Sequence, residues 1–223
     1  MDDSAKNNTA AKPRAVKPKT RPTRRRRDRR DEILKRAAEI FERQGFAHTS
    51  IEDIAREVGV KREAIYYYFK SRAEILLEII LPQSRGMLAG LREILDSEAT
   101  AGEKLRAAIR NQLDKYGPHP GYLEMAVALR EHHFHKEDQR FDDLRQVWKD
   151  YTAAWVELIR QGQISGAFHP EFDPKMIAFG ILGMCNWLSR WYDPAKPTSL
   201  DEIIETYCAM IAHGLVKPET AKS

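Results

Sequence analysis

The chain has 223 residues, of which 42% are hydrophobic, so it can bury a sizeable core as one medium domain or two small ones. It has no run of roughly 18 to 20 uninterrupted apolar residues and its N-terminus is polar and basic, which excludes a membrane span or secretory signal and favours the cytoplasm. The two cysteines, Cys185 and Cys208, lie too far apart in sequence to indicate a zinc site or a disulfide framework, and we expect two buried thiols.

The net charge of +4 is unevenly distributed along the chain. Residues 1–80 carry 20 Lys and Arg against 13 Asp and Glu, a net of +7, whereas the remaining residues have a net charge of −3. A positive field at one end suits a polyanionic partner such as nucleic acid, with an acidic membrane surface as the weaker alternative. We therefore expect double-stranded DNA, and no membrane, as the partner of the N-terminal third.

Residues 1–27 are predicted to form a disordered basic arm. They contain several prolines and almost no large apolar side chain, so they cannot bury enough surface to offset the entropy of ordering. The arm leads into "RRRRDRR" at 24–30, which is either a solvated charge run or a segment that lies along phosphates or in a minor groove. On the second interpretation, the DNA contacts come from Arg24, Arg25, Arg26 and Arg27.

Two short amphipathic helices follow the arginine run. Apolar residues recur at spacings of three and four over 31–44 and predict the first helix. The second is predicted over 51–58, because Thr49 or Ser50 can cap its start and Asp53 occupies the early acidic position that favours one. A helix of about two turns is marginal alone and must pack on its neighbours.

A third helix is predicted to begin near Lys61, after a turn that contains glycine. On a wheel of 100° per residue, Ile65, Tyr68 and Phe69 share one sector, and the opposing sector holds Arg62, Glu63, Tyr66 and Tyr67. Two short helices around such a turn, the second with a polar and aromatic outer face, form a helix-turn-helix pattern. The third helix is then the one that enters the major groove of DNA.

The rest of the chain also has helical periodicity and no convincing strand, so the predicted fold class is all-α. The expected helices cover 73–97 with a break or kink near Pro82, 102–116, 121–132, 137–161, 174–191 and 199–215. We predict a helix-turn-helix DNA-binding domain over 28–80, a larger effector-binding and dimerisation domain over 81–217, and a disordered tail over 218–223.

The segment 45–76, "GFAHTSIEDIAREVGVKREAIYYYFKSRAEIL", resembles the DNA-binding domain of TetR-family transcriptional regulators. That family carries an aromatic residue after a Gly, a Thr/Ser pair, Ile-Ala in the second helix, Gly-Val in the turn, a Tyr and a Phe in the third helix, and then a basic residue before an acidic one. The matching residues here are Gly45-Phe46, Thr49-Ser50, Ile54-Ala55, Gly59-Val60, Tyr66, Phe69, Arg72 and Glu74.

The resemblance implies a role for each matching position. Thr49 and Ser50 stand where the family caps the second helix and touches a phosphate, and Arg72 stands where a Lys commonly grips one. Further DNA contacts, to base edges or to the backbone, are expected from the third helix and the residue before it. These residues are Lys61, Arg62, Glu63, Ala64, Tyr66 and Tyr67. The family often has Ser or Thr in place of Lys61 and Gly in place of Glu63, so the operator sequence is not transferable from relatives.

A second resemblance lies in 183–203, "GMCNWLSRWYDPAKPTSLDEI". It is similar to the C-terminal region of TetR-family regulators of fatty-acid, aromatic-acid and steroid catabolism, several of which respond to acyl-coenzyme A thioesters. The resemblance implies a ligand-responsive repressor whose effector is a hydrophobic molecule of that class. The alternatives are an efflux-pump repressor that senses lipophilic toxins, favoured by acids in the cavity, and an architectural DNA-binding protein without an effector.

Candidate effector and dimer residues come from the larger domain. Aromatic residues at helical spacing pack in a core or line a pocket, and the candidates for the effector are Met125, Leu129, His132, Trp148, Trp155 and Trp187. The segment 179–188 is apolar nearly all round, which favours a homodimer through the last two helices. The interface candidates are Phe179, Gly180, Gly183, Met184, Trp187, Tyr207 and Ile211.

No enzyme, cofactor or metal is expected. His132, His133 and His135 do not converge on one point on a helix, as metal binding requires. The sequence also contains no nucleophile elbow, phosphate-binding loop or dinucleotide fingerprint.

Overall fold

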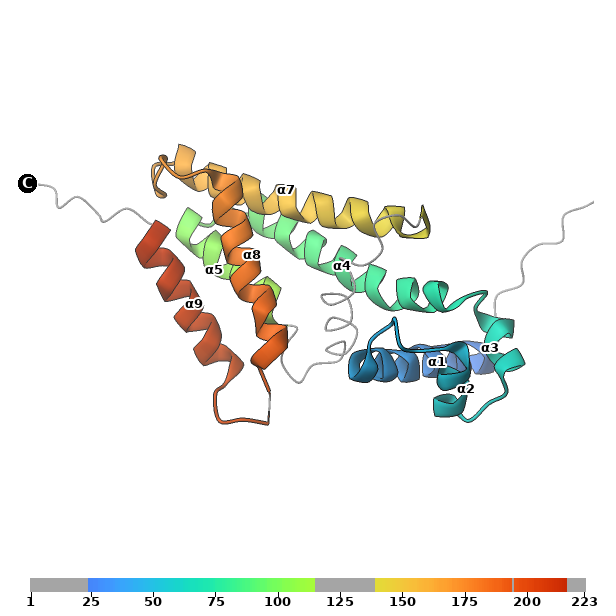
Figure 1. Cartoon of the computed structure of the whole chain (residues 1–223). Helices are drawn as coiled ribbons and strands as arrows, with labels where there is room; N and C mark the ends of the chain where they lie inside the picture. The colour runs from blue at the N-terminus through green and yellow to red at the C-terminus, as the bar shows by residue number, and fades with distance from the viewer. Residues whose placement is uncertain (1–23, 115–138, 194, 216–223) are drawn as a thin grey trace, which may run out of the picture.

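The computed structural model describes residues 24–114, 139–193 and 195–215, and its regular elements over these ranges are helical, as predicted for an all-α chain. Figure 1 shows α1, α2 and α3 at one end of the molecule and α5, α8 and α9 at the other, with α4 running between them. The arm expected over 1–23, the helix expected over 121–132, the tail expected over 218–223, and Met125, Leu129 and His132 lie outside the described residues.

The N-terminal end consists of α1 (Arg24–Gln44), α2 (Ile51–Val58) and α3 (Arg62–Tyr68). These helices share one apolar core, in which Ile54, Ile65 and Phe69 are at most 1% exposed. The rings of Phe41 and Phe46 meet edge to face at 5.3 Å, a geometry that favours aromatic pairs. The shared core explains how helices of seven and eight residues hold their shape.

The ends of α2 follow the expected capping chemistry. The Ser50 hydroxyl accepts from the Asp53 backbone N–H, and the Asp53 carboxylate accepts from the Ser50 backbone N–H at 2.9 Å. The Ser50 hydroxyl also donates to the Asp53 carboxylate, and this bond, followed by the one from the Ser50 backbone N–H, holds the pKa of Asp53 below its usual value. Gly59 ends the helix with a left-handed φ of 72°, which a residue with a side chain rarely adopts. By contrast, Lys61 precedes α3 without a side-chain cap, as its residue type implies.

The helix α1 begins at Arg24 and not at residue 31, so the prediction of disorder through residue 27 is wrong for 24–27. Arginine is a good helix former, and Arg29 pairs with Glu32 one turn further on at 2.7 Å. The Arg30 guanidinium also pairs with Glu78 of α4 and lies 4.8 Å from the centroid of the Phe69 ring. These long-range contacts attach the first turns of α1 to the folded domain.

The helix α4 (Arg72–Asp96) continues through Pro82, so of the break or kink predicted near this residue, the break is wrong. Proline has no backbone N–H to give to the carbonyl four residues earlier, but burial of Ile79 and Ile80 before it and of Met87 and Leu88 after it holds the helix together. The boundary expected between residues 80 and 81 therefore falls within one continuous helix. Both predicted domains therefore include part of α4.

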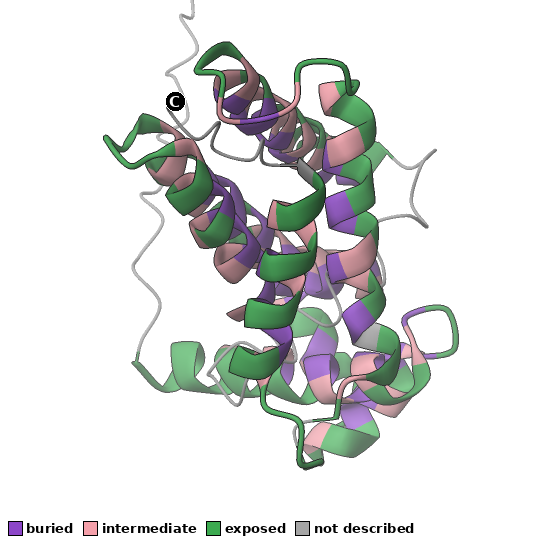
Figure 2. Ribbon diagram, turned by 90° about the vertical axis from the view of Figure 1, so that its left-hand side faces the viewer, coloured by how far each residue is buried: buried purple, intermediate pink, exposed green. Residues whose placement is uncertain are grey.

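The larger domain contains α5 (Ala101–Leu113), the short 3-10 turn η2 (Gln139–Phe141), α7 (Asp142–Ile164), α8 (Pro174–Trp191) and α9 (Leu200–Leu215). The bounds of α8 match the prediction and those of α9 differ by one residue at the start, whereas α7 begins five residues later than expected. Arg92 of α4 pairs with Asp150 of α7 at 3.1 Å. Figure 2 shows buried residues on the inward faces of the helices and exposed residues on the outer turns.

Candidate functional site

The three consecutive tyrosines of α3 divide between its two faces, as the helical wheel predicts. Tyr66 and Tyr67 are 43% and 64% exposed, whereas Tyr68 is half-buried and packs against the core. Ile65 and Phe69 are buried on the inner side. The outer face of α3 therefore carries aromatic hydroxyl groups that no core contact requires.

Arg62 is the first residue of α3, and its guanidinium is held by two neighbours. One amino group lies 2.7 Å from a carboxylate oxygen of Glu52 in α2, and the other donates to the Tyr66 hydroxyl at 3.1 Å. The Tyr66 hydrogen bond and then the Glu52 charge raise the pKa of Arg62. Sequence reasoning missed Glu52, because no local pattern pairs two residues ten positions apart on different helices.

The other predicted residues near the start of α3 lie on the same surface. Lys61 and Glu63 are exposed, and Ala64 is half-buried. The exposed part of α3 and the residue before it thus carry basic and aromatic side chains, as expected of a helix that reads the major groove, and also the carboxylate of Glu63.

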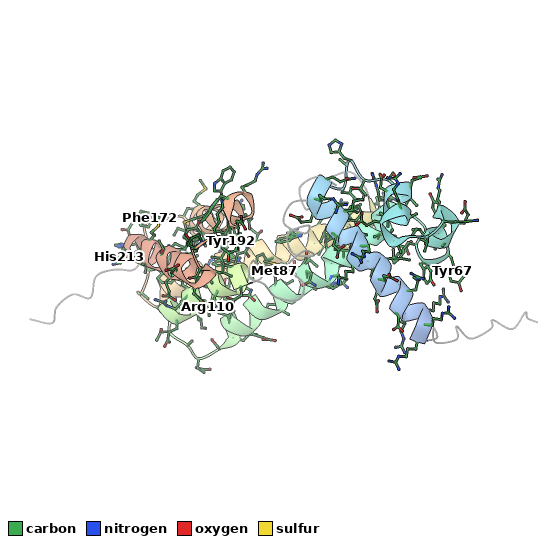
Figure 3. All side chains as sticks on the ribbon, turned by 90° about the horizontal axis from the view of Figure 1, so that it is seen from below. Tyr67, Met87, Arg110, Phe172, Tyr192 and His213 are labelled. Atoms are coloured by element: carbon green, nitrogen blue, oxygen red, sulfur yellow. The ribbon has the colours of Figure 1, made fainter. Side chains whose placement is uncertain are left out.

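A hollow of about 500 Å³ separates the start of α1 from the end of α3. It is lined by Tyr67, Tyr68 and residues of α1 between Arg25 and Glu32. The Arg26 guanidinium lies 5.0 Å from the centroid of the Tyr67 ring, within the range of a cation–π contact. Figure 3 shows Tyr67 at the outer end of this domain, far from Phe172 and His213 in the larger domain. All four arginines at 24–27 are exposed, and two of them, Arg25 and Arg26, line this hollow beside the end of α3.

The expectation that Thr49 touches a phosphate is wrong, because this residue is 1% exposed. Its hydroxyl donates to the Gly45 carbonyl at 2.8 Å and accepts from the Gln44 side chain at 3.2 Å. The capping role belongs to Ser50 alone, which is half-buried. Thr49 thus closes the turn between α1 and α2.

Arg72 also has a structural role that the resemblance did not imply. Its guanidinium donates to the Thr49 carbonyl and lies 4.1 Å from the centroid of the Phe46 ring. These contacts join the start of α4 to the turn between α1 and α2. These contacts leave other donors of the guanidinium available, so the expectation that Arg72 grips a phosphate stays a prediction.

The interior of the larger domain contains a chain of neutral polar groups. The Tyr151 hydroxyl donates to the Gln112 side-chain oxygen, and the Gln112 amide donates to Asn186 at 2.7 Å. Burial raises the pKa of Tyr151, and the neighbouring Trp155 side chain lowers it by a smaller amount, so the phenol stays protonated. Of the predicted effector residues on α7, Trp155 is fully buried and Trp148 half-buried, both close to this chain along the helix.

Trp187 differs from the other two tryptophans in its exposure, and its assignment to the effector site stays a prediction. It is 62% exposed on the outer side of α8, because residues 181, 185 and 188 take the inward side of the helix. Phe179, Gly180 and Gly183 are exposed on the same side.

The exposed apolar surface of α8 and α9 includes the predicted dimer residues. Met184, Tyr207 and Ile211 are half-buried at its edge. Sequence analysis missed Met176, Trp191 and Met210, which are 70%, 45% and 60% exposed. The spacing of 176, 180, 183, 187 and 191 along α8 is the signal that identifies this side of the helix.

Both cysteines are buried thiols, as expected, and burial raises the pKa of Cys185 to about 12. Within the described ranges, no group of three or more His, Cys, Asp or Glu side chains is placed to hold a metal ion. None of the helices described is both long and apolar enough to cross a membrane.

The second helix of this helix-turn-helix presents aromatic and basic groups beside a cluster of arginines. Such a surface defines a DNA-binding protein. Residues 33–79 match the family described as "Bacterial regulatory proteins, tetR family", and residues 98–215 match "Tetracyclin repressor-like, C-terminal domain". The chain belongs to the TetR family of transcriptional regulators, whose members are DNA-binding regulators and not enzymes.

Relatives with known structures or roles share both domains. The transcriptional repressor KstR2 of Mycolicibacterium smegmatis is 25% identical over 195 residues, which cover 87% of this chain and 94% of that protein. The ketosteroid transcriptional regulator KstR2 of Mycobacterium tuberculosis superposes with a TM-score of 0.79 at 26% identity, covering 85% of this chain and 96% of that one. AibR, in complex with isovaleryl coenzyme A and operator DNA, has the same fold, with a TM-score of 0.73 at 23% identity over 82% of this chain and 97% of that one.

Replacing Arg72 tests its structural role. We expect Arg72→Ala to destabilise the protein by about 1 to 3 kcal/mol, because it leaves the Thr49 carbonyl without its charged donor. Arg62→Ala is the matched control, since its partners are exposed and an exposed ion pair contributes only about 0 to 1 kcal/mol. Urea unfolding followed by circular dichroism measures both, and equal stability of the two variants would contradict the assignment.

The arginines at the start of α1 are tested by the salt dependence of DNA binding. Replacing Arg24, Arg25, Arg26 and Arg27 with Ala should flatten the slope of log affinity against log salt by about 0.9 for each lost phosphate contact. Alanine preserves helix propensity, so the change reports charge and not unfolding. Arg92→Ala, in the larger domain, is the control. An unchanged slope in the fourfold variant would show that these arginines do not reach phosphates.

Proposed function

We propose that the chain is a homodimeric transcriptional repressor, which binds a palindromic operator and is released from it by a hydrophobic effector, an acyl-CoA thioester. The observation that carries operator binding is the outer face of α3, where Arg62, Tyr66 and Tyr67 are exposed together. Arginine reads guanine through two parallel donors, and aromatic hydroxyls contact phosphates and bases in the major groove. One such helix reads one half-site.

The exposed apolar side of α8 and α9 supports a dimer. Large exposed apolar patches on a soluble protein mark sites of association, and this patch includes Phe179 and Trp187. A Cβ added at Gly180 or Gly183 would meet nothing within 4 Å, so a helix from a second copy has room to approach closely. A two-fold pair would present two α3 helices to the two halves of a palindrome.

The buried polar groups favour an effector whose buried part carries no charge. Among the described residues, the buried polar side chains are Thr49, Ser84 and Gln112, and no carboxylate is buried. A site for a cationic toxin needs a buried acid to offset the charge. The neutral chain through Gln112 and Tyr151 instead suits a carbonyl or hydroxyl group on an apolar ligand.

Two relatives support the effector class. KstR2 is named a ketosteroid regulator, and AibR is bound to isovaleryl coenzyme A. An acyl-CoA thioester has an apolar acyl group with a neutral carbonyl, and its charged nucleotide can remain near solvent. This chemistry matches an interior with neutral polar groups better than a lipophilic cation does.

The helix α4 connects the effector domain to the recognition surface. It pairs with α7 through Arg92 and Asp150 and with α1 through Glu78 and Arg30. An effector that prefers one position of α4 therefore shifts the population between two separations of the recognition helices. Moving that population from 1:99 to 99:1 requires a preference of about 5.5 kcal/mol.

Effector identity is tested on an operator selected by the protein from random duplex DNA. Fluorescence anisotropy of that duplex should fall when an acyl-CoA or steroid-CoA thioester is added and stay constant with free coenzyme A. Gln112→Leu removes the central amide of the buried chain and should weaken the thioester response by about tenfold, the loss expected when one hydrogen bond of about 1.5 kcal/mol disappears.

A lipophilic cationic dye is the comparison ligand for this titration. Release by the dye and not by any thioester would favour an efflux-pump repressor. Binding of selected and scrambled duplexes with equal affinity would instead indicate an architectural DNA-binding protein.

Dimerisation is tested by placing a charge on the apolar side of α8. Trp187→Glu should shift the protein from dimer to monomer in analytical ultracentrifugation, because an ionised carboxylate is costly in an apolar interface. Ala153→Glu, on an exposed position of α7, adds the same charge elsewhere and should leave the dimer intact. A dimer with unchanged affinity in the Trp187 variant would rule out this interface.

A further inference from the structure

The guanidinium of Arg62 is fixed from two helices before any DNA is present. Glu52 of α2 contacts one amino group at 2.7 Å, and the Tyr66 hydroxyl accepts from the other at 3.1 Å. The Tyr66 ring lies 5.3 Å from the guanidinium carbon. A side chain that otherwise samples many rotamers is thus restricted to one region of the recognition surface.

This ion pair lies where it contributes little to folding. The side chains of Arg62 and Glu52 are 54% and 49% exposed, and exposed pairs are weak because water and salt screen them. The carboxylate of Glu52 also lies 2.7 Å from Arg62, on the surface that we propose faces DNA, where a negative charge opposes binding to phosphates. Glu52 lies in the first turn of α2, where an exposed acid stabilises the helix only modestly, so its contact with Arg62 calls for another role.

Base reading supplies that role. A guanidinium has five N–H donors, so its contacts with Glu52 and Tyr66 leave donors free for a base. A bidentate contact with guanine requires two of those donors to be parallel and correctly aimed. An arginine that is already positioned loses less conformational freedom when it makes this contact.

We propose that Glu52 is a positioning residue for sequence discrimination, which holds Arg62 in the orientation that reads a base pair of the operator. This inference rests on the proposed function of operator binding. Glu52 then has two opposite effects: it increases the preference for the correct base pair and decreases the affinity for DNA of any sequence.

The opposite signs separate this role from a merely structural one. Glu52→Gln should raise the affinity for a scrambled duplex about twofold to fivefold, because a carboxylate near the phosphates is neutralised. The same variant should lower discrimination at the base pair that Arg62 reads, from roughly tenfold or more to about threefold or less. A loss of folded protein would lower both affinities together.

The experiment uses the full chain and a duplex that the wild type selects from a random library. Anisotropy measures binding to this duplex, to its single base-pair variants and to a scrambled duplex, for Glu52→Gln, Arg62→Ala and the double variant. Glu57→Gln is the matched control, since Glu57 lies on the same helix and pairs with a different arginine, Arg43, at 3.0 Å.

The inference holds if Glu52→Gln and Arg62→Ala lose discrimination at the same base pair, and if the double variant loses no more than Arg62→Ala alone. It is overturned if Glu52→Gln leaves discrimination at that base pair intact, if Glu57→Gln has an equal effect, or if Arg62→Ala changes discrimination nowhere. In these three cases operator binding itself still stands. Failure of the wild type to enrich any duplex would reject both the inference and the proposed function.

Discussion

A helix of seven residues is not stable alone in water, so the surface that α3 presents exists only while its inner side is packed. Ile65 and Phe69 provide that packing, and Arg30 covers the Phe69 ring while pairing with α4. Since α3 also lacks a side-chain cap at Lys61, tertiary contacts carry nearly all of its stability. The orientation of the exposed tyrosines is therefore set by the core beneath them.

The same dependence extends along α4. This helix contributes to the core of the DNA-binding domain near its start and packs on α7 further along, without a break at Pro82. Arg72 fixes its first turn to the turn between α1 and α2. The first turn of α4 is therefore joined to the DNA-binding domain by side-chain contacts as well as by the continuous chain.

Local patterns in the sequence predicted the features that depend on neighbouring residues. The division of the three tyrosines, the Ser50 cap, the bounds of α8 and its apolar outer side all follow from helical spacing or capping chemistry. The contacts that local patterns did not reveal join distant residues. Arg30, near the start of α1, binds Glu78 of α4, and the Arg72 guanidinium lies over the Phe46 ring; no spacing rule contains either contact.

The position of the four arginines 24–27 on a helix has an entropic consequence. A disordered segment loses about 1 to 2 kcal/mol of backbone conformational entropy for each residue that becomes ordered on a polyanion. For these arginines that loss occurs when the protein folds, so it does not reduce the free energy of association. Their charges also keep a fixed spacing, which selects for partners whose phosphates match it and against flexible polyanions that do not.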